Sequence, residues 1–251
     1  MYHYEYELAM EAALKAGDFL RENYQFHVDS QIGKDIKLSS DKKSEEIILN
    51  ILEKTNIPIL SEEAGIIEKK ENSKFWIIDP LDGTANYWKG IKELACVSIA
   101  LWENGQPILG VINRFEQKEV FSGIVGEGAW LNGEVIHTSD VNKLSDAILA
   151  TGFPVKRNYS SESLLGFVHQ VQKFKKVRML GAAAIMGAFV AAGRIDAYTE
   201  EQIMFWDIAA SSAIVKAAGG VVDIQMLEEY QCICCLFANK KLYQKYKELE
   251  S

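Results

Sequence analysis

The spacing of apolar residues in the first part of the chain predicts helices. Residues 4–24 carry Leu8 and Leu20 on an apolar stripe with a helical period, and residues 44–54 return to the same spacing. Residues 33–41 lie between these segments and are mostly polar, so a loop or a hairpin is expected there. The first segment is expected to form a long helix that covers the body of the fold.

Short runs of β-branched and aromatic residues predict the strands. Residues 75–78 form a wholly apolar run bounded by Pro80 and Gly83, so a buried strand is expected that stops at Asp79. Hairpin-like spacing after it predicts a meander that reaches the turn-rich residues 126–133. Further strands are expected at residues 94–102, 107–113, 118–123, 147–151, 176–180, 194–199 and 230–237.

The second half of the chain mixes strands with helices. Helical spacing is found at residues 161–173, small residues favour a helix at 182–192, and residues 206–218 form a clear helical pattern that Gly219-Gly220 ends. This order of elements predicts an α+β fold in which helices cover sheets. We expect one domain over residues 1–251, with a natural division into sub-lobes 1–140 and 141–251.

Composition narrows the classes of function. The chain has 251 residues, of which 48% are hydrophobic and 25% charged, as expected for a globular protein with a large core. The net charge of −8 and the pI near 5.2 disfavour a general nucleic-acid binder, which needs a basic face. We recognise no targeting signal and no run of membrane-spanning length, which predicts a cytoplasmic protein.

The four cysteines are expected in the core. Cys232, Cys234 and Cys235 crowd into one strand-like run, and their spacing differs from that of the cysteine pairs in zinc sites. Free cysteine is among the most buried residue types. The sequence therefore predicts core thiols and no disulfide framework.

Two carboxylates at the end of the central strand are the first candidates for chemistry. Asp79 and Asp82 stand beside each other in an Asp-Pro-x-Asp-Gly turn, and carboxylates held at one spot stay ionised most easily when they share cations. Thr84 is a candidate N-cap of a short helix whose free N–H groups suit a phosphate. The alternative is an ordinary surface turn, because Asp, Pro and Gly are common turn formers.

Further motifs elsewhere in the chain favour a functional interpretation of these two carboxylates. The chain carries, in this order, SEEAG at residues 61–65, WIIDPLDGTAN at 76–86 and WDIAA at 206–210. These motifs resemble those of the inositol monophosphatase family of magnesium-dependent, lithium-sensitive phosphatases, and the resemblance runs along nearly the whole chain. It implies a layered α-β-α-β-α sandwich of the inositol monophosphatase and fructose bisphosphatase type. It also implies a homodimer.

The resemblance implies a set of metal ligands. Glu62, Asp79 and the Leu81 carbonyl would hold one ion, Asp79, Asp82 and Asp207 a second, and Glu62 with water a third, weaker one. These hard oxygen ligands suit Mg²⁺ or Mn²⁺ rather than zinc. Two such ions about 4 Å apart can bind phosphate oxygens and lower the pKa of a bound water. The alternative for Asp207 is an acid that favours the helix macrodipole.

The same resemblance implies residues for catalysis and for phosphate binding. Thr84 and Asp41 would activate the water nucleophile, and Glu62 joins them through the third ion. Backbone N–H groups of Gly83 and Thr84 would contact the phosphate. Asp41 has an alternative role as the N-cap of the helix at residues 44–54.

Substrate contacts are less well matched to the family. The segment that contacts the alcohol in the family corresponds to Gly181, Ala182 and Ala183, and a family glutamate corresponds to Glu200. Ala182 lacks the usual hydroxyl and Ala85 replaces a threonine, which weakens the case for strict inositol specificity. Residues 147–154 resemble those of bacterial inositol monophosphatases, which argues for it.

These observations predict a Mg²⁺-dependent phosphomonoesterase of small sugar or polyol phosphates, with inositol 1-monophosphate as the first candidate. A 3′(2′),5′-bisphosphate nucleotidase and a fructose-1,6-bisphosphatase are alternatives; each needs cations for a second phosphate, for which the chain offers Lys156, Arg157, Arg178 and Arg194. A non-catalytic binding or regulatory protein on the same scaffold is the alternative from another class. A small phosphorylated metabolite is the expected partner, and neither nucleic acid nor membrane is.

Overall fold

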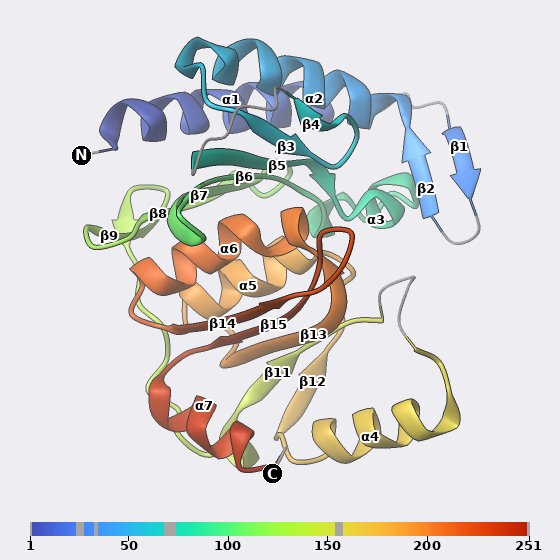
Figure 1. Ribbon diagram of the computed structural model, residues 1–251, viewed down its shortest axis with the longest axis vertical. Coiled ribbons are helices and arrows are strands. Elements are labelled where there is room, and N and C mark those ends of the chain that lie inside the picture. The colour runs from blue at the N-terminus through green and yellow to red at the C-terminus, as the bar shows by residue number, and fades with distance from the viewer. Residues whose placement is uncertain (1, 24–27, 33–34, 68–73, 154–157, 250–251) are drawn as a thin grey trace.

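The protein is built from alternating layers of helices and sheets. The computed structural model describes residues 2–23, 28–32, 35–67, 74–153 and 158–249. From top to bottom in Figure 1, helices α1 and α2, a first sheet, helices α5 and α6, a second sheet, and helices α7 and α4 follow one another. The α-β-α-β-α sandwich expected from the sequence is confirmed. The division into sub-lobes stays a prediction.

Helices α1 (His3–Glu22) and α2 (Ser39–Leu52) cover the outer face of the first sheet. The strands β1 (Val28–Ile32) and β2 (Asp35–Leu38), which lie between these helices in the sequence, pair antiparallel. Of the loop and the hairpin expected at residues 33–41, the hairpin is therefore found, and it begins earlier in the chain. Helix α2 begins at Ser39 rather than at residue 44. Asp41 lies in its first turn and accepts a hydrogen bond from the Leu38 N–H at 2.6 Å. The interpretation of Asp41 as the N-cap is therefore wrong, although its carboxylate does close the helix start.

The first sheet contains eight strands in the order β10-β9-β8-β7-β6-β5-β3-β4. Strands β5 to β10 form the expected antiparallel meander, and β3 joins its edge parallel to β5. The strands are β3 (Ile59–Ser61), β4 (Gly65–Ile67), β5 (Lys74–Asp82), β6 (Cys96–Glu103), β7 (Gln106–Arg114), β8 (Glu119–Ile124), β9 (Gly128–Leu131) and β10 (Glu134–Val135).

The second sheet contains five strands in the order β12-β11-β13-β15-β14. Strand β11 pairs parallel with β12 and β13, and β15 pairs antiparallel with β13 and β14. The strands are β11 (Ile148–Ala150), β12 (Lys176–Arg178), β13 (Ala197–Met204), β14 (Val221–Met226) and β15 (Gln231–Phe237). Strand β13 runs beyond the expected end at residue 199, and β14 was not predicted. Helices α4 (Ser161–Val171) and α7 (Lys240–Lys247) cover the outer face, and only α4 was predicted.

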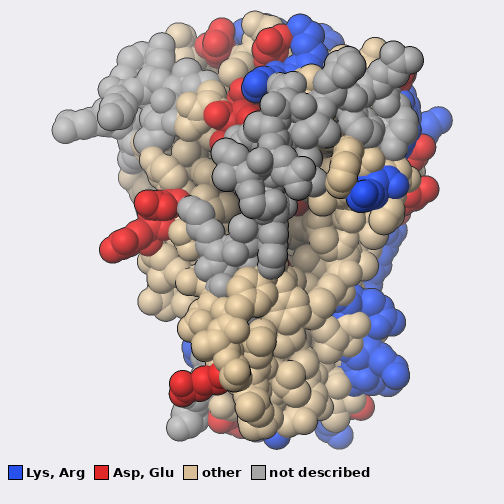
Figure 2. Space-filling model, turned by 90° about the vertical axis from the view of Figure 1, so that its right-hand side faces the viewer, with Lys and Arg blue, Asp and Glu red and all other residues tan. Residues whose placement is uncertain are grey.

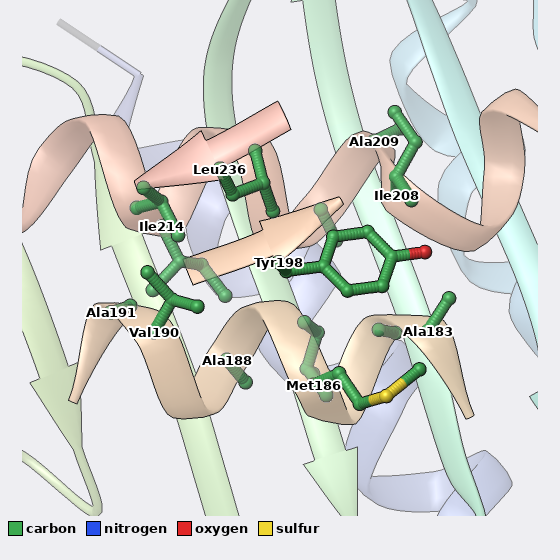
Figure 3. Packing of buried hydrophobic residues seen from close by; sticks show 14 of the residues in the cluster. Ala183, Met186, Ala188, Val190, Ala191, Tyr198, Ile208, Ala209, Ile214 and Leu236 are labelled. Carbon is green, nitrogen blue, oxygen red and sulfur yellow. The ribbon is translucent and has the colours of Figure 1, made fainter. Parts of the chain in front are cut away.

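Helices α5 (Ala183–Ala191) and α6 (Phe205–Ala217) lie between the sheets, where small residues allow close packing. Both helices are apolar nearly all round, as expected for a layer covered on both sides. A Cβ at Gly187 would lie 2.4 Å from the Ser211 Cβ, and one at Gly110 would lie 2.3 Å from the Ala210 carbonyl oxygen. Ala188, Tyr198 and Leu236 belong to the same buried cluster, where strand and helix side chains interdigitate (Figure 3). This rigid layer fixes the start of α6.

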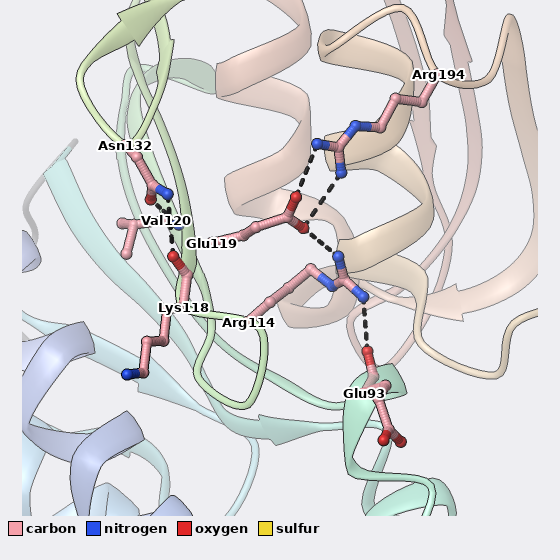
Figure 4. Close-up of polar contacts among 7 residues, drawn as sticks. All are labelled: Glu93, Arg114, Lys118, Glu119, Val120, Asn132 and Arg194. Carbon is pink, nitrogen blue, oxygen red and sulfur yellow. Dashed lines mark hydrogen bonds and ion pairs between the residues drawn. The ribbon is translucent and has the colours of Figure 1, made fainter.

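A partly exposed ion-pair network joins the first sheet to the turn after α5. Glu119 pairs with Arg114 and with Arg194, whose Nη2 lies 2.7 Å from the Glu119 carboxylate, and Arg114 also donates to the Glu93 carbonyl oxygen at 2.8 Å (Figure 4). Burial raises the pKa of Glu119, but the two guanidinium groups outweigh it and leave that pKa below its ordinary value.

All four cysteines are free and buried, which confirms the expected core thiols. Burial raises the pKa of the Cys232 thiol to about 12, so it stays protonated at neutral pH. Within the described residues, each helix is too short or too polar to cross a lipid bilayer.

Candidate active site

The carboxyl end of strand β5 carries two buried carboxylates, Asp79 and Asp82. Asp79 and Asp82 are only 1% and 7% exposed. The strand was expected to stop at Asp79, but it runs to Asp82, and its pairing with β6 is shifted between these two residues. Pro80 causes the irregularity, since it has no N–H to give to β6. Its carbonyl oxygen accepts the Ser44 hydroxyl of α2 at 2.8 Å, which ties this bend to the helix layer.

Asp82 lies at the start of helix α5. Its Oδ2 accepts the backbone N–H of Ala184 at 2.8 Å, while the N-cap position, Ala182, has no capping side chain. Asp82 therefore caps α5 from another part of the chain, where a carboxylate also meets the favourable end of the helix dipole. This contact brings the expected substrate residues Ala182 and Ala183 directly beside the expected metal ligand Asp82.

The turn after Asp82 depends on glycine. Gly83 adopts a φ of +85°, and a Cβ there would lie 2.4 Å from the Leu94 carbonyl oxygen. Gly83 is the N-cap of α3 (Thr84–Trp88), and Thr84 is the first helical residue. The predicted N-cap role of Thr84 is therefore wrong. Its hydroxyl instead donates to the Leu81 carbonyl oxygen at 2.9 Å, which links the expected nucleophile-activating residue to an expected metal ligand.

Glu62 lies in the turn that follows β3, next to Asp79. The Glu62 N–H donates to the Ile78 carbonyl oxygen at 3.3 Å, and its carboxylate shares a hydrogen bond with that of Asp79. A second glutamate supports this turn from α2: Glu45 accepts the Ser61 hydroxyl and, at 3.0 Å, the Ala64 N–H. Glu45 is only 8% exposed.

Sequence reasoning missed Glu45, although the pattern contained a signal. Glu45 falls three residues before Ile48 and seven before Leu52, so it lies on the buried stripe of α2. A carboxylate on an apolar stripe is expensive unless it has hydrogen-bond partners. The partners here are the two ends of the Glu62 turn.

The charges of neighbouring acids contribute to the raised pKa values of Asp79 and Asp207. Burial, then the charges of Glu62, Asp82 and Asp207, raise the pKa of Asp79 well above its ordinary value. Burial raises the pKa of Asp82 to about 7, although backbone N–H groups of α5 work against the shift. Asp207 lies in the first turn of α6. Burial raises its pKa, and the charges of Asp82, Glu62 and Glu200 raise it further. The four acids from three distant segments thus form one electrostatic cluster.

Within the described part of the chain, no group of three or more Asp, Glu, His or Cys side chains has the arrangement of a metal site. The donor set nevertheless fits a hard divalent cation, because it consists of carboxylates and a carbonyl and because burial raises the pKa values of Asp79, Asp82 and Asp207. The residues that could hold such a cation are Glu62, Asp79, Asp82 and Asp207, with the Leu81 carbonyl.

Glu200 lies beside this cluster on strand β13. It is 6% exposed, and its Oε2 accepts the Tyr198 hydroxyl at 3.0 Å. A Cβ at Gly152 would lie 2.6 Å from the carboxylate oxygens, so the glycine leaves the space that Glu200 fills. Gly181 is exposed and has a φ of +71°.

Asn86 links helix α3 to the backbone at Leu94 and at Leu180. It was not singled out from the sequence. Its Nδ2 donates to the Leu94 carbonyl oxygen at 2.9 Å and to the Leu180 carbonyl oxygen at 2.8 Å. One side chain of α3 thereby positions the loop that precedes Gly181. Asn within the DGTAN motif was visible, but its partner 94 residues away was not.

The cations proposed for a second phosphate have different fates. Arg194 is engaged with Glu119, and Arg178 ends strand β12, where its Nη1 donates to the Val177 carbonyl oxygen. Lys156 and Arg157 lie outside the described residues. On the side of the molecule in Figure 2, Lys and Arg gather along the right-hand edge, and acidic residues lie at the top and on the left.

Comparisons with known proteins agree with this architecture. The sequence model of the Inositol monophosphatase family matches residues 1–244. The Nus factor SuhB of Pasteurella multocida is 36% identical over 222 residues, which are 86% of this chain and 83% of that protein. The inositol-1-monophosphatase of Mesorhizobium japonicum is 35% identical over 221 residues, 85% and 83% of the two chains. The crystal structure of extragenic suppressor protein suhB from Bartonella henselae superposes with a TM-score of 0.87 at 31% identity, covering 98% and 97%.

Proposed function

Because the chain belongs to the inositol monophosphatase family, we propose that it is a Mg²⁺-dependent phosphomonoesterase of small polyol phosphates, with inositol 1-monophosphate as the preferred substrate. The observation that carries this proposal is the cluster of four acids, Glu62, Asp79, Asp82 and Asp207, in which burial raises the pKa of Asp79, Asp82 and Asp207 and the charges of neighbouring acids add to the shift at Asp79 and Asp207. Such a cluster favours binding of divalent cations, which relieve the repulsion. The similarity to a protein named inositol-1-monophosphatase supports the substrate class.

Glu62, Asp79, Asp82, Asp207 and the Leu81 carbonyl would hold two or three Mg²⁺ ions, with Mn²⁺ as a substitute. Bound ions of this kind supply a water nucleophile at neutral pH and neutralise the phosphate oxygens. Asp79 is central to the proposed set, since its pKa is raised by the charges of the three other acids. A ligand set drawn from β5, the β3 turn and α6 requires the folded layers to bring it together.

The remaining proposed roles belong to residues around the acids. Thr84, whose hydroxyl lies 2.9 Å from the Leu81 carbonyl oxygen, and Asp41, at the start of α2, would orient the attacking water and hold its proton. The N–H groups of Gly83 and Thr84 would contact the phosphate at the start of α3. Glu200 would accept a hydrogen bond from a substrate hydroxyl, and Gly181, Ala182 and Ala183 would border the alcohol.

The test is phosphate release from the purified protein with Mg²⁺. Inositol 1-phosphate, fructose 1,6-bisphosphate and 3′-phosphoadenosine 5′-phosphate are compared at matched concentrations, and lithium is added in a second series. We expect the first substrate to be hydrolysed fastest and lithium to inhibit. Preference for either bisphosphate would replace the proposed substrate with that of a fructose bisphosphatase or a bisphosphate nucleotidase.

The Asp82→Asn variant tests the metal site separately. It removes the negative charge of a proposed metal ligand with little change in volume. An asparagine Oδ1 can still accept the Ala184 N–H that Asp82 accepts at 2.8 Å. We expect hydrolysis to be abolished and the circular dichroism spectrum to be unchanged. Turnover retained in this variant would remove Asp82 from the proposed ligand set.

A regulatory binding protein is the second candidate, because several relatives are named Nus factor SuhB. This candidate predicts no phosphate release from any of the three substrates in protein that binds Mg²⁺, as measured by calorimetry. The proposed homodimer is tested by light scattering coupled to size-exclusion chromatography, and the proposed cytoplasmic location by cell fractionation.

A further inference from the structure

An apolar cavity lies between the two sheets, on the side of β5 away from its acidic end. Its volume is about 650 Å³, within the range of small-molecule sites, which is roughly 300–1,000 Å³. Four aromatic side chains line it: Phe75, Trp102, Phe205 and Tyr230. The active-site acids are not among the lining residues.

The aromatic wall of this cavity is held rigidly. The Trp102 Nε1 donates to the Ala209 carbonyl oxygen at 3.1 Å, and its ring meets that of Phe205 edge to face, with 4.9 Å between centroids. Trp102 is therefore fixed in orientation by α6. A rigid aromatic surface binds a flat apolar molecule with little loss of side-chain entropy.

Among the described residues, two charged ones line the cavity, Lys216 and Asp223. Strand β14 contributes Val222, Ile224 and Met226, which alternate along one face of the strand. Asp223 lies between them and points to the opposite face, where its carboxylate accepts the Tyr243 hydroxyl of α7.

Lys216, near the end of α6, supplies the positive charge at the cavity. Its Nζ lies 2.9 Å from the Gln106 Oε1, a neutral partner. No ion pair of Lys216 is found within the described part of the chain. A ligand anion at this end of the cavity would therefore meet an ammonium group that needs no acid to be displaced.

We propose that this cavity is a second ligand site, which binds a small aromatic molecule carrying one anionic group. The aromatic body fills the space between Trp102, Phe205 and Ile224, and the anion pairs with Lys216. The site is separate from the proposed phosphatase chemistry, because no residue of the acidic cluster contributes to it. Its occupant is distinguished from a sugar phosphate by its apolar body.

The test uses 1-anilinonaphthalene-8-sulfonate, which has an aromatic body and one sulfonate. We expect saturable binding to the folded full-length protein, with one probe per chain by calorimetry and enhanced probe fluorescence. Ile224→Trp fills the cavity from a half-buried position and should weaken binding at least tenfold. Lys216→Gln should weaken it about tenfold, the loss of one charge-assisted contact.

Matched controls separate this site from general stickiness and from the active site. Lys241→Gln changes an exposed lysine on α7 and should leave binding unchanged. The uncharged probe N-phenyl-1-naphthylamine should bind equally to the parent and to Lys216→Gln. Asp82→Asn should bind the sulfonate as the parent does, even though its hydrolysis is lost. Non-saturable binding, or binding that neither Ile224→Trp nor Lys216→Gln weakens in thermally stable protein, would overturn the proposal.

Discussion

The two ends of strand β5 differ in chemistry although they share one backbone. Trp76 and Ile77 are 0% and 3% exposed and pack into apolar clusters, whereas Asp79 and Asp82 are also buried but carry ionisable carboxyl groups. Burial of the first pair stabilises the fold by about 1.5–3 kcal/mol per side chain. Burial of the second pair costs stability, as their raised pKa values indicate. The strand thus separates the residues that hold the fold from those that do the proposed chemistry.

The largest effects on activity and stability are expected from substitutions of two residues on the same face of β5. Asp79→Asn should lower kcat/KM at least about 10³-fold, since bound metal contributes several kcal/mol of transition-state stabilisation. It should not lower the unfolding free energy of the metal-free protein, because it removes a buried charge. Urea denaturation and initial rates measure the two quantities.

Ile77→Ala, two residues earlier, is the counterpart. It should lower the unfolding free energy by about 2–5 kcal/mol through the lost methyl groups and the space they leave. The activity per folded molecule should stay within a few-fold of the parent. Equal losses of stability in both variants would show that the two ends of β5 are not different in kind.

The next largest effect is expected where the acidic end turns. Gly83→Ala adds a Cβ that would lie 2.4 Å from the Leu94 carbonyl oxygen at a φ of +85°. We expect about 10²-fold lower kcat/KM, the effect of displacing catalytic groups by about 1 Å. Gly105→Ala is the matched control, since Gly105 has a φ of +71° with no heavy atom within 4 Å of the added Cβ. If both variants lose activity equally, backbone strain and not the close approach is responsible.

A smaller effect is expected from the side chain that supports the Glu62 turn. Glu45→Gln keeps the size of the group but weakens its hydrogen bonds to the Ser61 hydroxyl and the Ala64 N–H. Groups that orient metal ligands typically change metal affinity about 10–100-fold. We expect the Mg²⁺ concentration for half-maximal rate to rise about tenfold, with kcat at saturating Mg²⁺ nearly restored. Glu46→Gln, at an exposed neighbour that pairs with Lys43, should leave the Mg²⁺ dependence unchanged.

Local sequence indicated Asp79 and Asp82, which follow an apolar run at the end of their own strand. Glu62 and Asp207 were selected only because their motifs resemble those of a family, and none of these patterns shows what the four acids contact. The cap that Asp82 provides for α5 spans 102 residues. Such contacts depend on how the layers pack, which the period of apolar residues does not specify.

Helix starts show the same limit on a smaller scale. Thr84 is a common N-cap residue, but Gly83 takes the position because only glycine fits its left-handed backbone beside the Leu94 carbonyl. The alternative role of Asp41 as an N-cap is wrong, because its carboxylate closes the helix from within the first turn. Strand β14 and helix α7 were missed although both carry a pattern: Val222, Ile224 and Met226 alternate along β14, and the buried Leu242 and Tyr246 lie four residues apart on α7.

The smallest expected effect concerns pH and the acidic end in the absence of substrate. The pKa of Asp82 is raised from 3.8 to about 7 in the folded protein. Between these values the folded state keeps a proton that the unfolded state has lost. The unfolding free energy of the metal-free protein should therefore fall as pH rises through this window.

Added Mg²⁺ should counter that fall, because a cation replaces the proton on the cluster. We expect the increase in melting temperature on adding Mg²⁺ to be a few degrees larger at pH 8 than at pH 5, since about 1 kcal/mol corresponds to roughly 2–4 °C in a domain of this size. Asp82→Asn should reduce this pH dependence, whereas Asp146→Asn, at an exposed acid outside the cluster, should not. A Mg²⁺ effect of equal size at both pH values in the parent would mean that the ion does not compete with protons at these acids.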